Sequence, residues 1–109
     1  MKNLLGALVL FLAFSMNASA QEKFRKVDEK VEAKTNLEAL SQVIQLDAKL
    51  SQDLIGLFEY KYRTLNENLS AERKAELTRI IELKLRATLT PDQMLSIEKK
   101  EGLLKKLTN

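Results

Sequence analysis

The sequence contains no cysteine and no histidine, and these absences remove the side chains behind several kinds of chemistry. Ser–His and Cys–His nucleophile pairs cannot be assembled, and neither can the usual zinc, copper and nickel sites. Without cysteine there is also no disulfide framework and no thiol for a lipid anchor. Carboxylates alternate with Lys and Arg at spacings typical of solvated ion pairs. We therefore expect a protein that is not an enzyme and that needs no metal and no cofactor.

Proline and glycine are also scarce, with one and three residues among 109. A fold rich in β-turns needs more of both, so the composition favours long helices. Because the glycines are isolated, they cannot form a loop that cradles phosphate. The formal net charge of +3 is small, and the charges of both signs are interspersed. This pattern argues against a nucleic-acid partner.

Residues 1–20 have the three parts of a secretory signal peptide. Lys2 provides the positive start, an apolar run covers Leu4 to Phe14, and small residues precede Gln21. The apolar run is shorter than the roughly 20 residues that a membrane-spanning helix needs. We predict export, cleavage after Ala20 and a soluble product.

Charged residues of alternating sign dominate residues 21–34. Phe24, Val27 and Val31 have helical spacing, but so few apolar groups offset little of the entropy lost on ordering. The segment is therefore either a disordered arm or a helix with one narrow apolar stripe. We place the helical domain at residues 35–109, where Thr35 and Glu38 form the pattern of a capping box.

Further cap signals divide this domain into helices. Asp47 either caps a second helix or lies within a longer first one, and Ser70 caps a third helix. The short connection before Ser70 makes its two flanking helices antiparallel neighbours. Thr90, Pro91 and Gln93 combine an N-cap, a proline at the first helical position and a capping box. The expected fold is an all-α helical hairpin of about four helices.

The second and third helices carry broad apolar faces. In the second helix we interpret the stripe as core or as a binding face; it consists of Leu50, Leu54, Leu57, Phe58 and Leu65. The third helix has one row that suits the hairpin core and a second row that a single neighbour cannot cover: Leu77, Ile81 and Leu85, then Ile80, Leu83 and Ala87. Since a small domain without disulfides gains from association, we expect a homodimer with Ile80 and Leu83 in its interface. The basic amphipathic end at Leu103 to Leu107 is either frayed or a contact for a membrane or partner.

Leu89, Thr90 and Gln93 also match a Leu-Thr-x-x-Gln motif. A degenerate first copy begins at Leu46 and Asp47, with aspartate in place of threonine and leucine in place of glutamine. On these residues the chain resembles the Spy/CpxP-like family of small periplasmic helical proteins. In that family the motifs are structural and set the bends of a helical hairpin.

The resemblance implies a curved antiparallel dimer in the periplasm. Some members of the family are ATP-independent chaperones that hold unfolding envelope proteins, and others restrain a stress-sensing kinase. We expect a holdase for unfolded or partly folded envelope proteins; the alternatives are a dedicated adaptor or regulator of one envelope partner and a protein that binds membrane surfaces. The candidate client-binding residues combine apolar and basic side chains: Phe58, Lys61, Tyr62, Leu65, Arg73 and Arg86.

Overall fold

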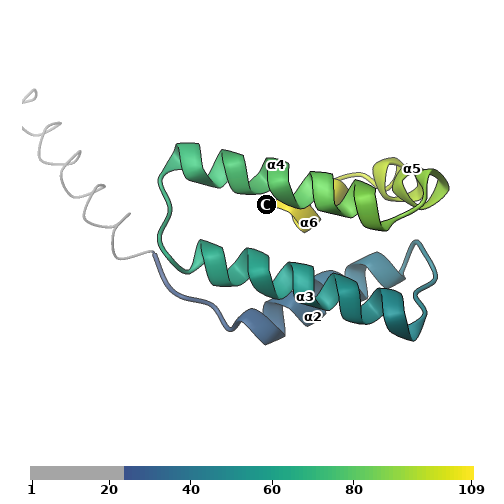
Figure 1. Ribbon diagram of the computed structural model, residues 1–109, viewed down its shortest axis with the longest axis horizontal. Helices are drawn as coiled ribbons and strands as arrows, with labels where there is room; N and C mark the ends of the chain where they lie inside the picture. Colours follow the sequence, from purple (N-terminus) through teal and green to yellow (C-terminus); the bar gives the residue numbers. More distant parts are fainter. Residues whose placement is uncertain (1–23) are drawn as a thin grey trace, which may run out of the picture.

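The computed structural model describes residues 24–109, and within this range the chain forms α-helices and no strands (Figure 1). The helices are α2 (Glu29–Ser41), α3 (Ala48–Leu65), α4 (Ala71–Thr88), α5 (Pro91–Lys99) and α6 (Leu103–Thr108). The predicted all-α class is confirmed. The signal peptide expected at residues 1–20 and its cleavage site lie outside the described residues. Among the helices of residues 24–109, none combines the length and the apolar character that crossing a membrane requires.

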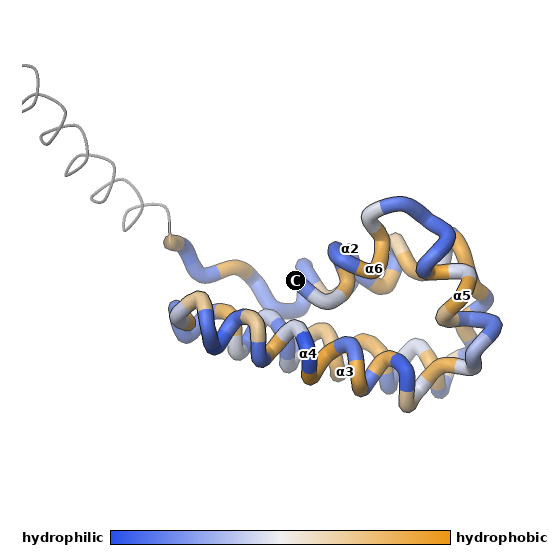
Figure 2. Tube along the Cα trace, turned by 90° about the horizontal axis from the view of Figure 1, so that it is seen from above, coloured by the Kyte–Doolittle hydropathy of each residue, from blue (hydrophilic) through white to orange (hydrophobic). Residues whose placement is uncertain are grey.

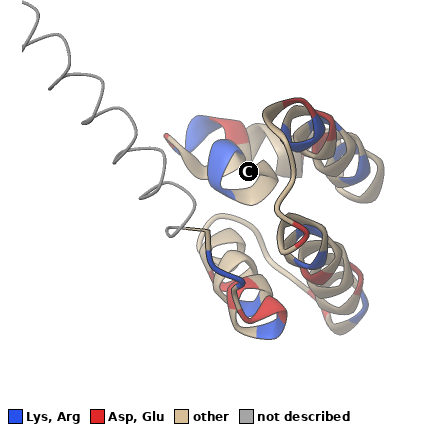
Figure 3. Ribbon diagram, turned by 90° about the vertical axis from the view of Figure 1, so that its left-hand side faces the viewer, with Lys and Arg blue, Asp and Glu red and all other residues tan. Residues whose placement is uncertain are grey.

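The long helices α3 and α4 are antiparallel neighbours, as the short connection between them predicts (Figure 1). Helix α2 packs along α3, and the short α6 packs against both α4 and α2. Seen from one end, the helices surround a common interior, and basic and acidic residues are mixed on them (Figure 3). Along α3 and α4 hydrophilic and hydrophobic residues alternate, as they do in amphipathic helices (Figure 2).

The hydrogen bonds at the helix starts confirm the predicted caps Ser70 and Thr90, and they decide the alternative left open at Asp47. Asp47 Oδ1 accepts a bond from the Leu50 N–H at 2.7 Å, so α3 is a separate helix that Asp47 caps. Ser70 Oγ caps α4 in the same way. At the start of α5 the Gln93 N–H donates to Thr90 Oγ1 at 3.1 Å, and the Thr90 N–H donates to Gln93 Oε1 at 2.9 Å. This is a complete capping box, because each residue satisfies the backbone of the other.

The predicted start of the first helix at Thr35 is wrong, because α2 begins at Glu29. Asp28 caps it, with Oδ1 accepting bonds from the N–H groups of Lys30 and Val31. Thr35 lies inside the helix, where its hydroxyl donates to the Val31 carbonyl. Both Asp28 and Thr35 suit an N-cap, and tertiary burial decides between them: starting at Asp28 places Ala33 in a helical turn that packs into the core.

The core lies between the helices and draws on all of them. Its buried apolar side chains are Ala33, Leu40, Ile44, Leu54, Phe58, Leu77, Ile81, Leu85, Leu89, Met94, Ile97, Leu103 and Leu107. The row at Leu77, Ile81 and Leu85 is therefore core, as expected. The expectation of a frayed end at Leu103 to Leu107 is wrong, because this segment forms α6 and buries two of its leucines.

Candidate functional site

The outward side of the α3–α4 hairpin exposes apolar side chains, and we call it the outer face. Tyr60 on α3 is 37% exposed and Leu83 on α4 is 55% exposed. Ile80 lies one turn before Leu83 and is half-buried. Of the other helices, α2 packs mainly on α3, and α5 and α6 pack on α4.

Two shallow grooves between α3 and α4 meet at Tyr60. One has a volume of about 580 Å³ and is lined by Asp53, Leu57, Tyr60, Lys84, Ala87 and Thr88. The other is lined by Tyr60, Thr64, Leu69, Arg73, Glu76, Leu77 and Ile80. Apolar side chains thus lie beside cations and carboxylates in the lining of both grooves. A surface of this kind suits an apolar segment of another polypeptide.

The two predicted client-binding arginines differ in their surroundings. Arg73 is exposed and lines the second groove. Arg86 instead binds Glu98 at 2.9 Å and Glu82 at 3.0 Å, which joins α4 to α5. Hydrogen bonds to Glu98 and then Glu82 raise the pKa of Arg86. Arg86 is therefore an ion-pair residue of the fold, and Arg73 alone of the two belongs to the outer face.

Phe58 and Lys61 do not lie on a surface, which corrects their prediction as client-binding residues. Both side chains are 0% exposed. Tyr62 and Leu65, the other predicted contacts on α3, are half-buried. Phe58 belongs to the apolar stripe of α3. It follows Leu54 by one helical turn, so both side chains face the core.

The Lys61 ammonium is buried with a complete set of hydrogen-bond partners. Its Nζ donates to the main-chain oxygen of Leu107 at 2.8 Å, to that of Lys106 at 3.2 Å and to Asn36 Oδ1 at 3.2 Å. Three N–H donors thus meet three acceptors. The ammonium also lies 4.5 Å from the centre of the Tyr62 ring. Lys61 on α3 therefore connects α2 to α6, a role that a search for surface cations misses.

Burial lowers the pKa of Lys61 from 10.5 to about 8. The carboxylate of Glu32 raises this pKa, and the nearby charge of Lys106 lowers it. Burial has the opposite effect on Tyr62, whose pKa it raises because the phenolate is the charged form. The Asn36 amide donates to Tyr62 Oη and to the Glu32 carbonyl, both at 2.7 Å. Asn36 thus orients the aromatic ring that covers the ammonium.

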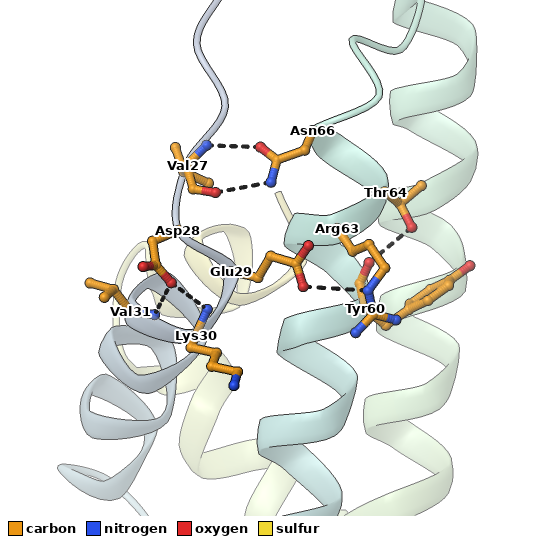
Figure 4. A network of polar contacts seen from close by, with 9 residues as sticks. All are labelled: Val27, Asp28, Glu29, Lys30, Val31, Tyr60, Arg63, Thr64 and Asn66. Atoms are coloured by element: carbon orange, nitrogen blue, oxygen red, sulfur yellow. Dashed lines mark hydrogen bonds and ion pairs between the residues drawn. The ribbon is translucent and has the colours of Figure 1, made fainter.

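A second amide holds the chain before α2 against the end of α3 (Figure 4). Asn66 Oδ1 accepts from the Val27 N–H at 2.8 Å, and Asn66 Nδ2 donates to the Val27 carbonyl at 2.9 Å. Beside it, Arg63 pairs with Glu29 at 3.3 Å. Within residues 24–34, the chain thus has no regular secondary structure up to Asp28 and is helical from Glu29. Neither interpretation of the charged arm included this amide contact.

Sequence reasoning misses three residues of these clusters: Asn36, Tyr60 and Asn66. Asn36 falls in the first turn of a helix predicted to start at Thr35, where an exposed amide is ordinary. Tyr60 falls outside the apolar stripe of α3. A signal for Lys61 does exist, since it lies three residues after Phe58 and four before Leu65, on the apolar stripe.

The Leu-Thr-x-x-Gln motif forms the corner between α4 and α5. Leu89 is buried at the turn, and Thr90 and Gln93 close the capping box. At the degenerate copy Leu46 packs partly against the core and Asp47 caps α3. The motif residues thus act on the backbone of the chain itself.

Fold and site together define a small all-α protein with an exposed apolar face and a buried lysine. Comparison of the chain with protein-family models, with curated proteins and with solved structures finds no match.

Proposed function

We propose that this protein is a binding protein and not an enzyme: an ATP-independent holdase that keeps unfolded or partly folded envelope proteins from aggregating. The outer face carries this proposal. Tyr60 and Leu83 present apolar area to solvent, and two grooves extend from Tyr60 between the helices. An unfolded client exposes apolar segments of many sequences, and a shallow apolar face can contact them without a fixed register.

The charged residues that line the grooves support the same proposal. The lining includes two cations and two carboxylates: Arg73, Lys84, Glu76 and Asp53. Charges of either sign speed the encounter with a client segment of opposite charge. Because the face is small and open to water, binding should be weak and reversible.

Export to the periplasm belongs to the same proposal and rests on the signal peptide expected at residues 1–20. Cleavage after Ala20 should give a protein that begins at Gln21. The intact mass of the protein recovered from the envelope measures this, and a mass that includes residues 1–20 would contradict it.

Self-association remains a prediction, and it would use the same face. Ile80 and Leu83 are its expected contacts, and Leu83 is among the more exposed apolar residues in the described part of the chain. Sedimentation of the residue 21–109 protein over a concentration series tests it. A dimer that dissociates with Leu83→Glu is the expected result, and a monomer at high concentration would contradict it. Since a dimer and a client would compete for the outer face, holdase activity per protomer should fall when dimer forms.

The decisive experiment for the holdase proposal is light scattering by aggregating clients. Residues 21–109 should delay the aggregation of several unrelated proteins diluted from denaturant. A Tyr60→Ala, Leu83→Ala double variant should lose most of this effect. Leu95→Ala is the matched control, because Leu95 is 48% exposed on α5, away from the grooves.

The same assay separates the proposal from its alternatives. If the wild-type protein delays no client, the holdase proposal falls and a dedicated adaptor or regulator of one envelope partner takes its place. If the double variant and the control lose activity equally, binding does not use the outer face. Binding to anionic lipid vesicles without any effect on clients would favour the membrane-surface alternative.

A further inference from the structure

Helix α6 is attached to the molecule differently from the other helices. It has six residues, and helices of this length are not stable in water by themselves. It begins after Gly102, whose φ of 79° lies in the left-handed region that favours glycine, and no side chain caps its start. Helix α6 therefore depends on docking, through buried Leu103, Leu107 and Thr108.

Lys61 is the polar anchor of α6. Its ammonium binds the main-chain oxygens of Lys106 and Leu107, in the last turn of the helix, where the helix dipole is negative. On the other side Thr78 Oγ1 of α4 lies 3.3 Å from Asn109 Oδ1. The oxygens that Lys61 binds belong to the backbone, so any helical segment with the same shape offers them.

The docked state also has an electrostatic cost. Burial lowers the pKa of Lys61 to about 8, which means that the ammonium is less stable under α6 than in water. When α6 leaves, the ammonium is hydrated again. This hydration offsets part of the free energy needed to expose Leu103 and Leu107 to water. Release of α6 breaks two main-chain hydrogen bonds to Lys61, and water can then bind both the ammonium and the freed carbonyl oxygens.

We propose that α6 is a detachable cover, and that the groove beneath it is a second binding site for a short apolar helical segment of a client. Two leucines of that segment, four residues apart, would take the places of Leu103 and Leu107, and its last carbonyl oxygens would bind Lys61. The occupant is inferred from how α6 itself is seated. The proposal rests on the holdase function, because it names a second place where clients bind.

The test uses the residue 21–109 protein and a fluorescent synthetic peptide with the sequence of residues 103–109. Because the chain has no cysteine, a disulfide can lock α6 without competing thiols. Thr78→Cys and Asn109→Cys replace two side chains already in contact, and Asn109 follows the last helical residue, so its backbone can adjust. The matched control is Asn109→Cys alone, which carries one of the two substitutions and has no second cysteine in the chain to pair with.

Fluorescence anisotropy should show weak peptide binding to the wild-type protein and to both reduced variants. Oxidation of the Thr78→Cys, Asn109→Cys variant should weaken binding by about tenfold or more, because α6 must unfold locally to open the groove. Oxidation of the control variant should leave binding unchanged. A peptide with Leu103→Asp and Leu107→Asp should not bind.

Two results would overturn the proposal that α6 is a detachable cover. One is equal peptide binding to the oxidised and the reduced Thr78→Cys, Asn109→Cys variant, and the other is no peptide binding to the wild-type protein at millimolar concentrations. The aggregation assay is read separately. If the wild-type protein binds the peptide but does not delay the aggregation of any client, the holdase function is refuted, while the groove beneath α6 is still a peptide-binding site. If the oxidised Thr78→Cys, Asn109→Cys variant delays client aggregation as well as the reduced variant does, the holdase function stands and uses the outer face alone.

Discussion

Charged side chains usually lie on the surface of a protein and aromatic ones usually lie inside, but on the two sides of α3 this order is reversed. Tyr60 is 37% exposed on the outer face, whereas the next residue, Lys61, is fully buried. The difference comes from what lies opposite each residue. Asn36 and the end of α6 offer three oxygens to Lys61, while Tyr60 faces the groove between α3 and α4. Burial therefore follows the partners that the tertiary structure supplies, and not the hydropathy of the residue alone.

This comparison assigns different tasks to the two sides. The inner side holds α2, α3 and α6 together, so changes there should lower the free energy of unfolding. The outer side contributes little packing, so changes there should affect binding while leaving stability nearly intact.

The largest effect is expected from Phe58→Ala on the inner side. Loss of a fully buried phenylalanine should lower the free energy of unfolding by about 3–5 kcal/mol, because it leaves a cavity among packed side chains. The matched outer change, Tyr60→Ala, should cost about 1 kcal/mol or less. Urea unfolding measures both, and equal losses would remove the distinction between the sides.

Asn36→Ala should have the next largest effect. It leaves one N–H of Lys61 and the Tyr62 hydroxyl without their partner in a buried site. The free energy of unfolding should fall by about 2 kcal/mol, within the usual range for an unsatisfied buried group. Asn66→Ala is the control, since it also removes two amide hydrogen bonds, but these are open to solvent. If both variants lose the same free energy of unfolding, burial of the hydrogen bonds around Lys61 makes no extra contribution to stability.

The pH dependence of stability should report the Lys61 cluster directly. The pKa of Lys61 falls from its ordinary 10.5 to about 8 in the folded protein, so between these pH values the unfolded chain binds more protons. Stability should therefore rise with pH, by about 1 kcal/mol from pH 7 to pH 9. The raised pKa of Tyr62 acts in the opposite direction above pH 10, where the unfolded chain loses its proton first.

The charged groups around Lys61 make this rise testable by substitution. Glu32 of α2 raises its pKa and Lys106 of α6 lowers it. Asn36→Asp places a carboxylate at the amide position, which should raise the pKa of Lys61 and flatten the rise between pH 7 and pH 9. Urea unfolding at several pH values measures this, and an unchanged slope in the variant would assign the rise to another group.

The smallest effect is expected at the corner between α4 and α5, which belongs to neither side. Thr90→Ala removes the capping box and should lower stability by about 1 kcal/mol, while holdase activity stays unchanged. Ser96→Ala is the control within α5, where the hydroxyl only donates to the Asp92 carbonyl. Lost activity with an unchanged thermal midpoint would show that Thr90 contacts a client.

The sequence by itself determined the all-α class and the starts of α4 and α5. Ser70 and Thr90 cap helices through bonds that span only three residues, so local chemistry is sufficient to predict them; at Asp47 the same chemistry left two alternatives open. The buried row on α4 also followed from helical spacing. These features depend on the chain near each residue, which is what a sequence pattern contains.

Only the tertiary structure decided the start of α2, the docking of α6 and the positions of Lys61 and Tyr60. Asp28 and Thr35 are both good caps, and the choice between them depends on what Ala33 and Asn36 meet after folding. A lysine is buried when several acceptors converge on it, and those of Lys61 come from residues 25, 45 and 46 positions away. No local pattern contains such separations, because they are set by how the helices cross.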